Sequence, residues 1–402
     1  MSQLKVDAIH SEDGGSSNIE LDDSRNTTCK GNLTVDGNIA VTGTGLTDTL
    51  SFRNLIRNGA MKVNQRGAYT GQGTSGKYGT DGWELKGQAS GMVHSFIHQD
   101  TGMNEFPKCL RMDCTTAATG AVTEVKITQQ VEGQDLGAFK FGTSSAESIT
   151  VSFWCRSTQA STFVVWMHRD GGGRHNAKTF AISAADTWEK KTITFSPDTS
   201  GTPTFDNERG FQIAWVLNSG TGYTSGSSPN GTWEAITDVN RYAGITATIG
   251  GNTNDYFDLT GVQVETGTTA TEFEHRSFGD ELVRCQRYLQ VFGNDGKFYT
   301  SGATDGNSNG RMAINLGCPL RASPTVKTGG STIRMFLHDD YKETTSTPSI
   351  MNFAPNSNQV ALQVGGYSGL TSGRVATFMY KDENKDIFFS GDDKNLALEA
   401  EL

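Results

Sequence analysis

Two pairs of neighbouring carboxylates come closest to a catalytic spacing: Asp206 with Glu208, and Asp280 with Glu281. A glycoside hydrolase uses one carboxyl group as the acid and a second, roughly 5–10 Å away, as the nucleophile or base. Neither pair stands in a recognisable catalytic motif, and the second is equally well explained as the acidic first turn of a helix. The segment His168-Arg-Asp170 has no Gly-x-Ser-x-Gly motif to complete a hydrolase triad. We therefore expect no catalytic residue and no enzymatic activity.

Candidate metal ligands are few and poorly spaced. His94 and His98 could share one face of a strand, but no third ligand accompanies them, and the 6 cysteines include no Cys-x-x-Cys pair. Carboxylates in turns, at Asp295, Asp305 and Asp392-Asp393, offer oxygen ligands without completing a calcium loop. We expect ordinary side chains at these positions, hence no metal and no cofactor, with Ca²⁺ binding in the turns as an alternative.

Aromatic side chains on loops indicate chemistry of another kind, which is glycan binding. Sugar rings pack against aromatic faces and hydrogen-bond to a few well-placed polar groups. Tyr223 and Trp233 flank a Gly- and Ser-rich loop, 219–231, that has little else to bury them. They must therefore either fold back on their domain or contact a ligand. Tyr341 and Tyr367 are further ligand-binding candidates, nearer the end of the sequence.

The charge balance is acidic, because 34 Lys and Arg against 44 Asp and Glu give a net charge of -10. Binding to nucleic acid depends on an excess of cationic side chains that neutralise phosphates, so we expect no nucleic-acid partner. No apolar run approaches the length of roughly 18 residues that a membrane helix needs. The first residues also lack the apolar core of a secretion signal, so synthesis in a cytoplasm is expected.

Residues 1–50 differ from the rest of the chain, since no aromatic residue occurs before Phe52. They contain a six-residue repeat, NLTVDG at 32–37 followed by NIAVTG at 38–43. Alternation along a strand places four apolar side chains of this repeat on one face: Leu33, Val35, Ile39 and Val41. One chain offers nothing to cover that face, so we expect several copies to intertwine about an axis. A lone β-hairpin turning at Asp36-Gly37 is the alternative.

The middle of the sequence, 51–276, is typical of a β-sandwich or jelly roll, because many short strand patterns alternate with turn residues. Segments 149–155 and 211–217 alternate apolar and polar residues most regularly. Their predicted core positions include Phe153, Cys155 and Trp215.

One convincing helix is predicted at 277–289, with Ser277 as its N-cap. Its apolar stripe consists of Phe278, Leu282, Cys285 and Leu289. Strand patterns return after residue 290 and predict a second, smaller β-sandwich. The fold class is therefore all-β, with one short linking helix. The expected domains are 1–50, 51–276 and 277–402.

Several segments resemble bacteriophage tail fibres that carry a carbohydrate-binding-module-like jelly roll. The opening of that domain is matched by LIRNGAM at 55–61 and YGTDGW at 78–83. Its closing strand and exit are matched by LTGVQVETG at 259–267, ATEFEHR at 270–276 and CQRY at 285–288. PLRASPTV at 319–326 and ALEAEL at 397–402 are similar to the terminal domains of such fibres, and MSQLKVDAI at 1–9 is similar to their virion-proximal start.

The resemblance implies a homotrimeric virion protein that binds a host-cell surface polysaccharide without covalent chemistry. Residues 1–50 would attach it to other structural proteins of the virion, after synthesis in the host cytoplasm. Weak binding at one site would be multiplied by the three copies. A capsid or neck fibre is one alternative. A glycan-depolymerising tailspike is another, although the sequence lacks the long β-helix repeat usual in such enzymes.

Overall fold

The computed structural model describes residues 8–9, 19–21, 27–29, 53–72, 77–292, 297–328, 332–337, 341–354, 357–381 and 396–402. The chain forms two compact units, Met1–Leu50 and Ser51–Leu402. The first unit contains a small antiparallel sheet of β1 (Ala8–Ile9), β2 (Ile19–Leu21) and β3 (Thr27–Cys29). The expected trimer-interface residues, Leu33, Val35, Ile39 and Val41, lie outside the described residues, so the homotrimer stays a prediction.

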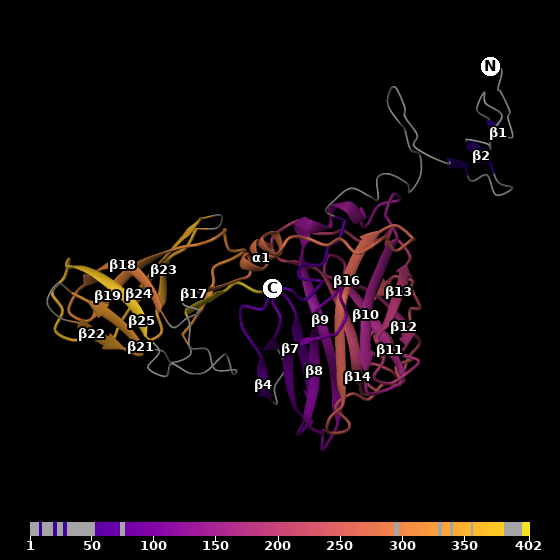
Figure 1. Ribbon diagram of the computed structural model, residues 1–402, viewed down its shortest axis with the longest axis horizontal. Coiled ribbons are helices and arrows are strands. Elements are labelled where there is room, and N and C mark those ends of the chain that lie inside the picture. The colour runs from indigo at the N-terminus through magenta and orange to yellow at the C-terminus, as the bar shows by residue number, and fades with distance from the viewer. Residues whose placement is uncertain are drawn as a thin grey trace. The chain divides into compact units, whose positions relative to one another are not determined.

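Two antiparallel sheets form a β-sandwich in the second unit (Figure 1). The six-stranded sheet has the order β13 (Glu189–Phe195), β10 (Ile149–Ser157), β16 (Tyr256–Thr266), β8 (Lys108–Thr116), β7 (Val93–Asp100), β4 (Tyr69–Gln72). The seven-stranded sheet has the order β15 (Glu234–Ala235), β12 (Arg174–Ala181), β11 (Thr162–Arg169), β14 (Arg209–Ser219), β9 (Val122–Glu132), β6 (Glu84–Ala89), β5 (Lys77–Tyr78). Two short 3-10 helices, η2 (Gly133–Phe139) and η3 (Asp238–Asn240), lie in the connections.

The core of the sandwich follows from strand alternation, which sends every second side chain between the sheets. Trp215 of β14 is fully buried, with its ring centroid 5.6 Å from that of Trp83 and 5.4 Å from that of Phe153. Cys155 of β10 is buried as well, and burial raises the pKa of its thiol. The predicted core positions Phe153, Cys155 and Trp215 are thus confirmed.

Helix α1 (Phe278–Gln286) follows the sandwich within the predicted range. Ser277 Oγ accepts a hydrogen bond from the backbone N–H of Asp280 at 3.1 Å, so the predicted N-cap is confirmed. The predicted apolar stripe is only partly right, because Cys285 is buried whereas Phe278 is 56% exposed. Glu281 is buried instead, since its carboxylate accepts a hydrogen bond from the backbone N–H of Asn58 at 2.5 Å.

The strands after α1 form a smaller β-sandwich, here called the distal domain. One sheet has the order β22 (Tyr341–Thr344), β21 (Thr332–Phe336), β25 (Val375–Lys381), β18 (Lys297–Asp305), β19 (Asn309–Asn315), β24 (Gln359–Val364), β23 (Ser349–Asn352). The other consists of β17 (Leu289–Phe292), β26 (Leu396–Glu399) and β20 (Thr325–Lys327), in that order. Met335, Phe378 and Leu398 contribute to the core that the two sheets share. The predicted all-β fold is confirmed for the part of the chain that the structure describes.

None of the helices in the described ranges has the length and apolar character that would let it cross a membrane.

Candidate functional site

A second apolar cluster lies on the outer face of the seven-stranded sheet, away from the core. It forms because neighbouring strands place alternate side chains on opposite faces, so that Trp215 of β14 enters the core whereas Trp166 of β11 points outward. Residues of segment 220–246 cover the cluster, chiefly the fully buried Tyr242. The Tyr223 end of the loop that the sequence singles out therefore packs on this outer face.

Three aromatic rings in this cluster meet edge to face. The ring of Tyr242 lies 5.9 Å from that of Trp166 at an angle of 86°, and 5.6 Å from that of Tyr223 at 60°. The Tyr242 hydroxyl donates a hydrogen bond to Glu124 at 2.7 Å and accepts one from Lys126 at 2.8 Å. These contacts hold the rings in place and leave Tyr223 half-buried.

A row of polar side chains crosses the same face beside the rings. Cross-strand pairing places His175 of β12, His168 of β11, Gln212 of β14 and Gln130 of β9 next to one another. The His168 ring stacks on Trp166, with centroids 5.5 Å apart and an interplanar angle of 12°. We call this set of residues the His168 face, which consists of Gln130, Trp166, His168, Gln212, Tyr223 and Tyr242. His168 and Tyr223 are half-buried, whereas the other four are buried.

The polar groups of the His168 face are largely uncharged. Gln212 donates a hydrogen bond to Thr128 Oγ1 at 2.9 Å, and Gln130 donates one to Glu84 at 3.1 Å. Burial lowers the pKa of His168 to about 4, against the opposite effect of Asp170. The imidazole is therefore neutral at pH 7, with one nitrogen donating and the other accepting.

An ion pair lies at one end of the polar row. Arg209 donates two hydrogen bonds to Asp170, at 2.7 and 2.6 Å, and a longer one to the Gln130 side chain at 3.4 Å. The side chain of Arg209 is 33% exposed and that of Asp170 is 28% exposed, and their opposite charges compensate each other. Aromatic rings beside uncharged donors and acceptors suit a hydroxyl-rich ligand better than a highly charged one.

The structure separates the four aromatic residues that the sequence singles out. Tyr223 belongs to the His168 face, whereas Trp233 is buried in the sandwich core and donates its indole N–H to the Ser196 carbonyl at 2.9 Å. Tyr367 is buried in the core of the distal domain, and Tyr341 of β22 is 50% exposed. The loop around Trp233 thus folds back on the sandwich, one of the two outcomes that the sequence leaves open for it.

Two polar residues of the face, Gln130 and Gln212, escaped the sequence analysis, which considered His168 only as part of an incomplete catalytic triad. Alternation alone could have placed Gln212 on an outer face, since it stands between Phe211 and Ile213 in a predicted strand. It could not have joined Gln212 to His168 and Gln130, because their adjacency depends on the strand order and register.

The paired carboxylates have structural partners. Asp206 accepts a hydrogen bond from the backbone N–H of Glu208 at 3.0 Å, and Glu208 forms an ion pair with Arg321 at 3.3 Å. Asp280 accepts a hydrogen bond from the Ser277 hydroxyl at 2.7 Å. Across the described ranges, no group of three or more His, Cys, Asp or Glu side chains could hold a metal ion.

No protein-family model matches the chain, and no curated protein matches it. Matching solved structures include the enzymatically active domain of tailspike protein 4 from bacteriophage CBA120, at 9% identity and a TM-score of 0.31, over 53% of this chain and 21% of that one. The chain thus spans about a fifth of that tailspike structure. TmCBM61 in complex with β-1,4-galactotriose matches at 10% identity and a TM-score of 0.28, over 54% of this chain and 99% of that one. A family 11 carbohydrate-binding module from a Clostridium thermocellum cellulase matches at 11% identity and a TM-score of 0.26, over 50% and 98%.

Proposed function

We propose that this chain is a bacteriophage tail fibre whose sandwich binds a host-surface polysaccharide through the His168 face, without enzymatic chemistry. The observation that carries the proposal is the half-buried Tyr223, which packs on Tyr242 in the same aromatic cluster as Trp166, the ring that stacks on His168 of the polar row. Such a surface can pack against a sugar ring and hydrogen-bond to its hydroxyl groups. The matched structures that are named as carbohydrate-binding modules agree with this proposal but do not carry it.

The charge pattern favours an uncharged sugar as the ligand. Lys126 pairs with Glu124 at 2.8 Å, and Arg209 pairs with Asp170 at 2.6 Å. Arg241, which lies over the Tyr223 ring, pairs with Asp238 at 2.6 Å, so these cations are compensated. His168 adds no charge at neutral pH. An acidic sugar would gain little from such a surface, whereas a neutral one can pack on the Tyr223 ring and hydrogen-bond to the neutral imidazole.

Assembly into a homotrimer would raise the overall affinity for the polysaccharide above that of a single site. A homotrimer joined through residues 32–43 and attached to the virion through residues 1–50 would present three equivalent faces to one cell. Linked sites raise the overall affinity by orders of magnitude without any new contact. The fibre would therefore need only weak binding at each face.

Titration against extracted bacterial surface polysaccharides tests the binding proposal. The Tyr223→Ala and His168→Ala variants, which alter the two half-buried members of the face, should each lower the affinity of the chain about tenfold or more, the usual effect of removing an anchoring contact. Tyr299→Ala is the matched control, because Tyr299 is 57% exposed on the distal domain. Unchanged affinity in both variants, or a loss on Tyr341→Ala instead, would contradict the assignment to this face.

The tail-fibre role needs a separate measurement. Electron microscopy of virions with antibodies against the sandwich should show label on the tail. Label on the capsid or neck would contradict the tail assignment and leave the binding proposal intact.

A further inference from the structure

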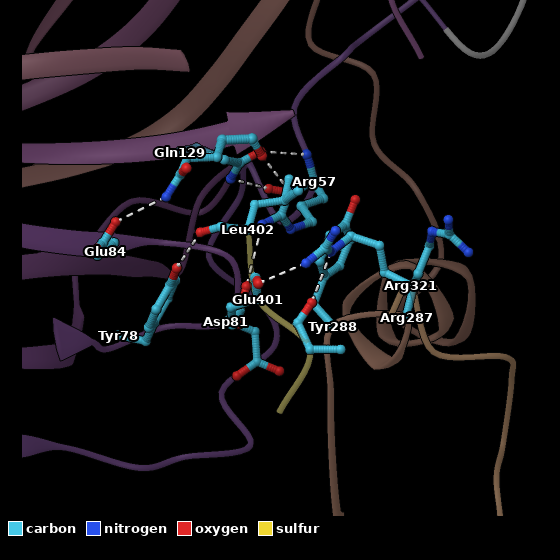
Figure 2. Close-up of polar contacts among 12 residues, drawn as sticks. Arg57, Tyr78, Asp81, Glu84, Gln129, Arg287, Tyr288, Arg321, Glu401 and Leu402 are labelled. Carbon is cyan, nitrogen blue, oxygen red and sulfur yellow. Dashed lines mark hydrogen bonds and ion pairs between the residues drawn. The ribbon is translucent and has the colours of Figure 1, made fainter. Parts of the chain in front are cut away.

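The end of the described chain makes its contacts with the sandwich through carboxylates. Figure 2 shows Glu401 and Leu402 next to Arg57 and Tyr78, which belong to the beginning of the sandwich. Arg66 Nη2 lies 3.0 Å from a carboxylate oxygen of Glu401 and 3.2 Å from one of Glu399. Arg57 Nη2 lies 3.6 Å from the other Glu401 oxygen. Two arginines of the sandwich therefore contact two carboxylates, that of Glu399 at the end of β26 and that of Glu401 just after it.

A third arginine binds the backbone of the same segment. Arg321 donates hydrogen bonds to the carbonyl oxygens of Ala400 and Glu401, both at 3.0 Å, and to that of Asn207 at 2.8 Å. Asn207 lies in the loop that joins β13 to β14 of the sandwich, and its side-chain N–H donates a hydrogen bond to the Arg321 carbonyl at 2.8 Å. The hydroxyl of Tyr78 donates to the Leu402 carbonyl at 3.4 Å. The segment is thus held by its backbone as well as by its charges.

The apolar cores do not continue across this junction. The residues that form the core of the sandwich and those that form the core of the distal domain are two separate sets with no member in common. Apolar burial stabilises each domain by itself, so the arrangement of one domain on the other depends on contacts such as those of Arg66 and Arg321.

The ion pairs of the junction are buried but incompletely satisfied. The side chains of Arg57 and Glu401 are each 9% exposed. Arg57 Nε, Arg66 Nη1 and Glu401 Oε2 have no hydrogen-bond partner among the described residues. By contrast, the nearby Glu132 receives two hydrogen bonds from Arg287 and one from Tyr288, at 2.6–2.7 Å. A buried pair with unmet hydrogen bonds offsets less of its desolvation cost than a fully hydrogen-bonded pair does, so the Glu401 pair is the weaker of these two contacts.

We propose that residues 399–402 form a latch that fixes the distal domain on the sandwich. Arg57, Arg66 and Tyr78 of the sandwich bind it, and Arg321 of the distal domain holds its backbone and contacts Asn207 of the sandwich. Losing the carboxylate contacts leaves the segment held only by its backbone, through Arg321 and Tyr78, and lets the two domains move against each other, while each keeps its own core.

Distances between spin labels on the two domains test the latch in the full chain. Thr116→Cys on the sandwich and Ser372→Cys on the distal domain, both exposed, carry the labels after Cys29→Ser and Cys318→Ser remove two other cysteines. The unmodified latch should give one narrow distance distribution. Glu401→Gln should broaden it at least twofold, because Arg57 and Arg66 are then left without their shared carboxylate.

Two further variants keep the test decisive. Glu399→Gln alters a side chain that is 29% exposed, so it should broaden the distribution less and without loss of fold. Glu343→Gln is the matched control, since it breaks an ion pair with Arg334 within the distal domain. Broadening in both latch variants but not in the control would support the latch. The latch would be overturned if a folded Glu401→Gln chain gave a distribution as narrow as that of the parent. If Glu401→Gln fails to fold, the same result in Glu399→Gln would overturn it.

Discussion

His94 of β7 is a titratable side chain enclosed in the sandwich. It is 1% exposed, and neither ring nitrogen has a hydrogen-bond partner within the described part of the chain. Burial lowers the pKa of His94 to about 4, whereas a histidine in an unfolded chain titrates near a pKa of about 6.5. Between about pH 6.5 and 4 the His94 imidazole is therefore protonated in the unfolded state but neutral in the folded state. The free energy of unfolding should fall as the pH drops from about 6.5 to 4.

Urea unfolding at pH 7 and at pH 5 checks this prediction for His94. The His94→Leu variant should lose less stability between the two pH values than the parent chain does. Burial also lowers the pKa values of His98, His168 and His175, but all three remain in parent and variant, so the difference isolates His94. An identical loss in the two proteins would mean that His94 does not resist protonation.

Strand β14 contributes side chains to both faces of the seven-stranded sheet. Trp215 fills the core, while its neighbours Ala214 and Val216 belong to the outer cluster below Tyr242. Trp215→Ala should lower the free energy of unfolding by about 3–5 kcal/mol, the range for removing a large buried aromatic side chain. Calorimetry provides the measurement, with Tyr299→Ala as an exposed control of small effect. A Trp215→Ala midpoint equal to that of the parent would contradict the packing described for β14.

Strand alternation explains how far these elements could be predicted from the sequence. It requires only neighbouring residues, so the inward positions of Phe153 and Trp215 followed from local pattern. The His168 face unites residues 130, 168 and 212 through a strand order that no local pattern encodes. The same limit applies to Glu281, whose burial depends on Asn58, more than two hundred residues away.

For the whole molecule, the homotrimer remains a prediction from the repeat at 32–43. Replacing Val35→Asp together with Val41→Asp would add like charges to the face that three copies should bury. Sedimentation should then show monomers where the parent sediments as a trimer. A trimer that persists in the double variant would contradict the role of the repeat in assembly.

Hydrogen–deuterium exchange of the full chain with a bound polysaccharide tests most directly whether the His168 face is the binding surface. The ligand should slow exchange in 126–130, 164–168, 212–216 and 220–246, which contribute this face, and leave β21, β22 and β25 of the distal domain unchanged. Slowed exchange in those distal strands, with no change in β9, β11 and β14, would contradict the account.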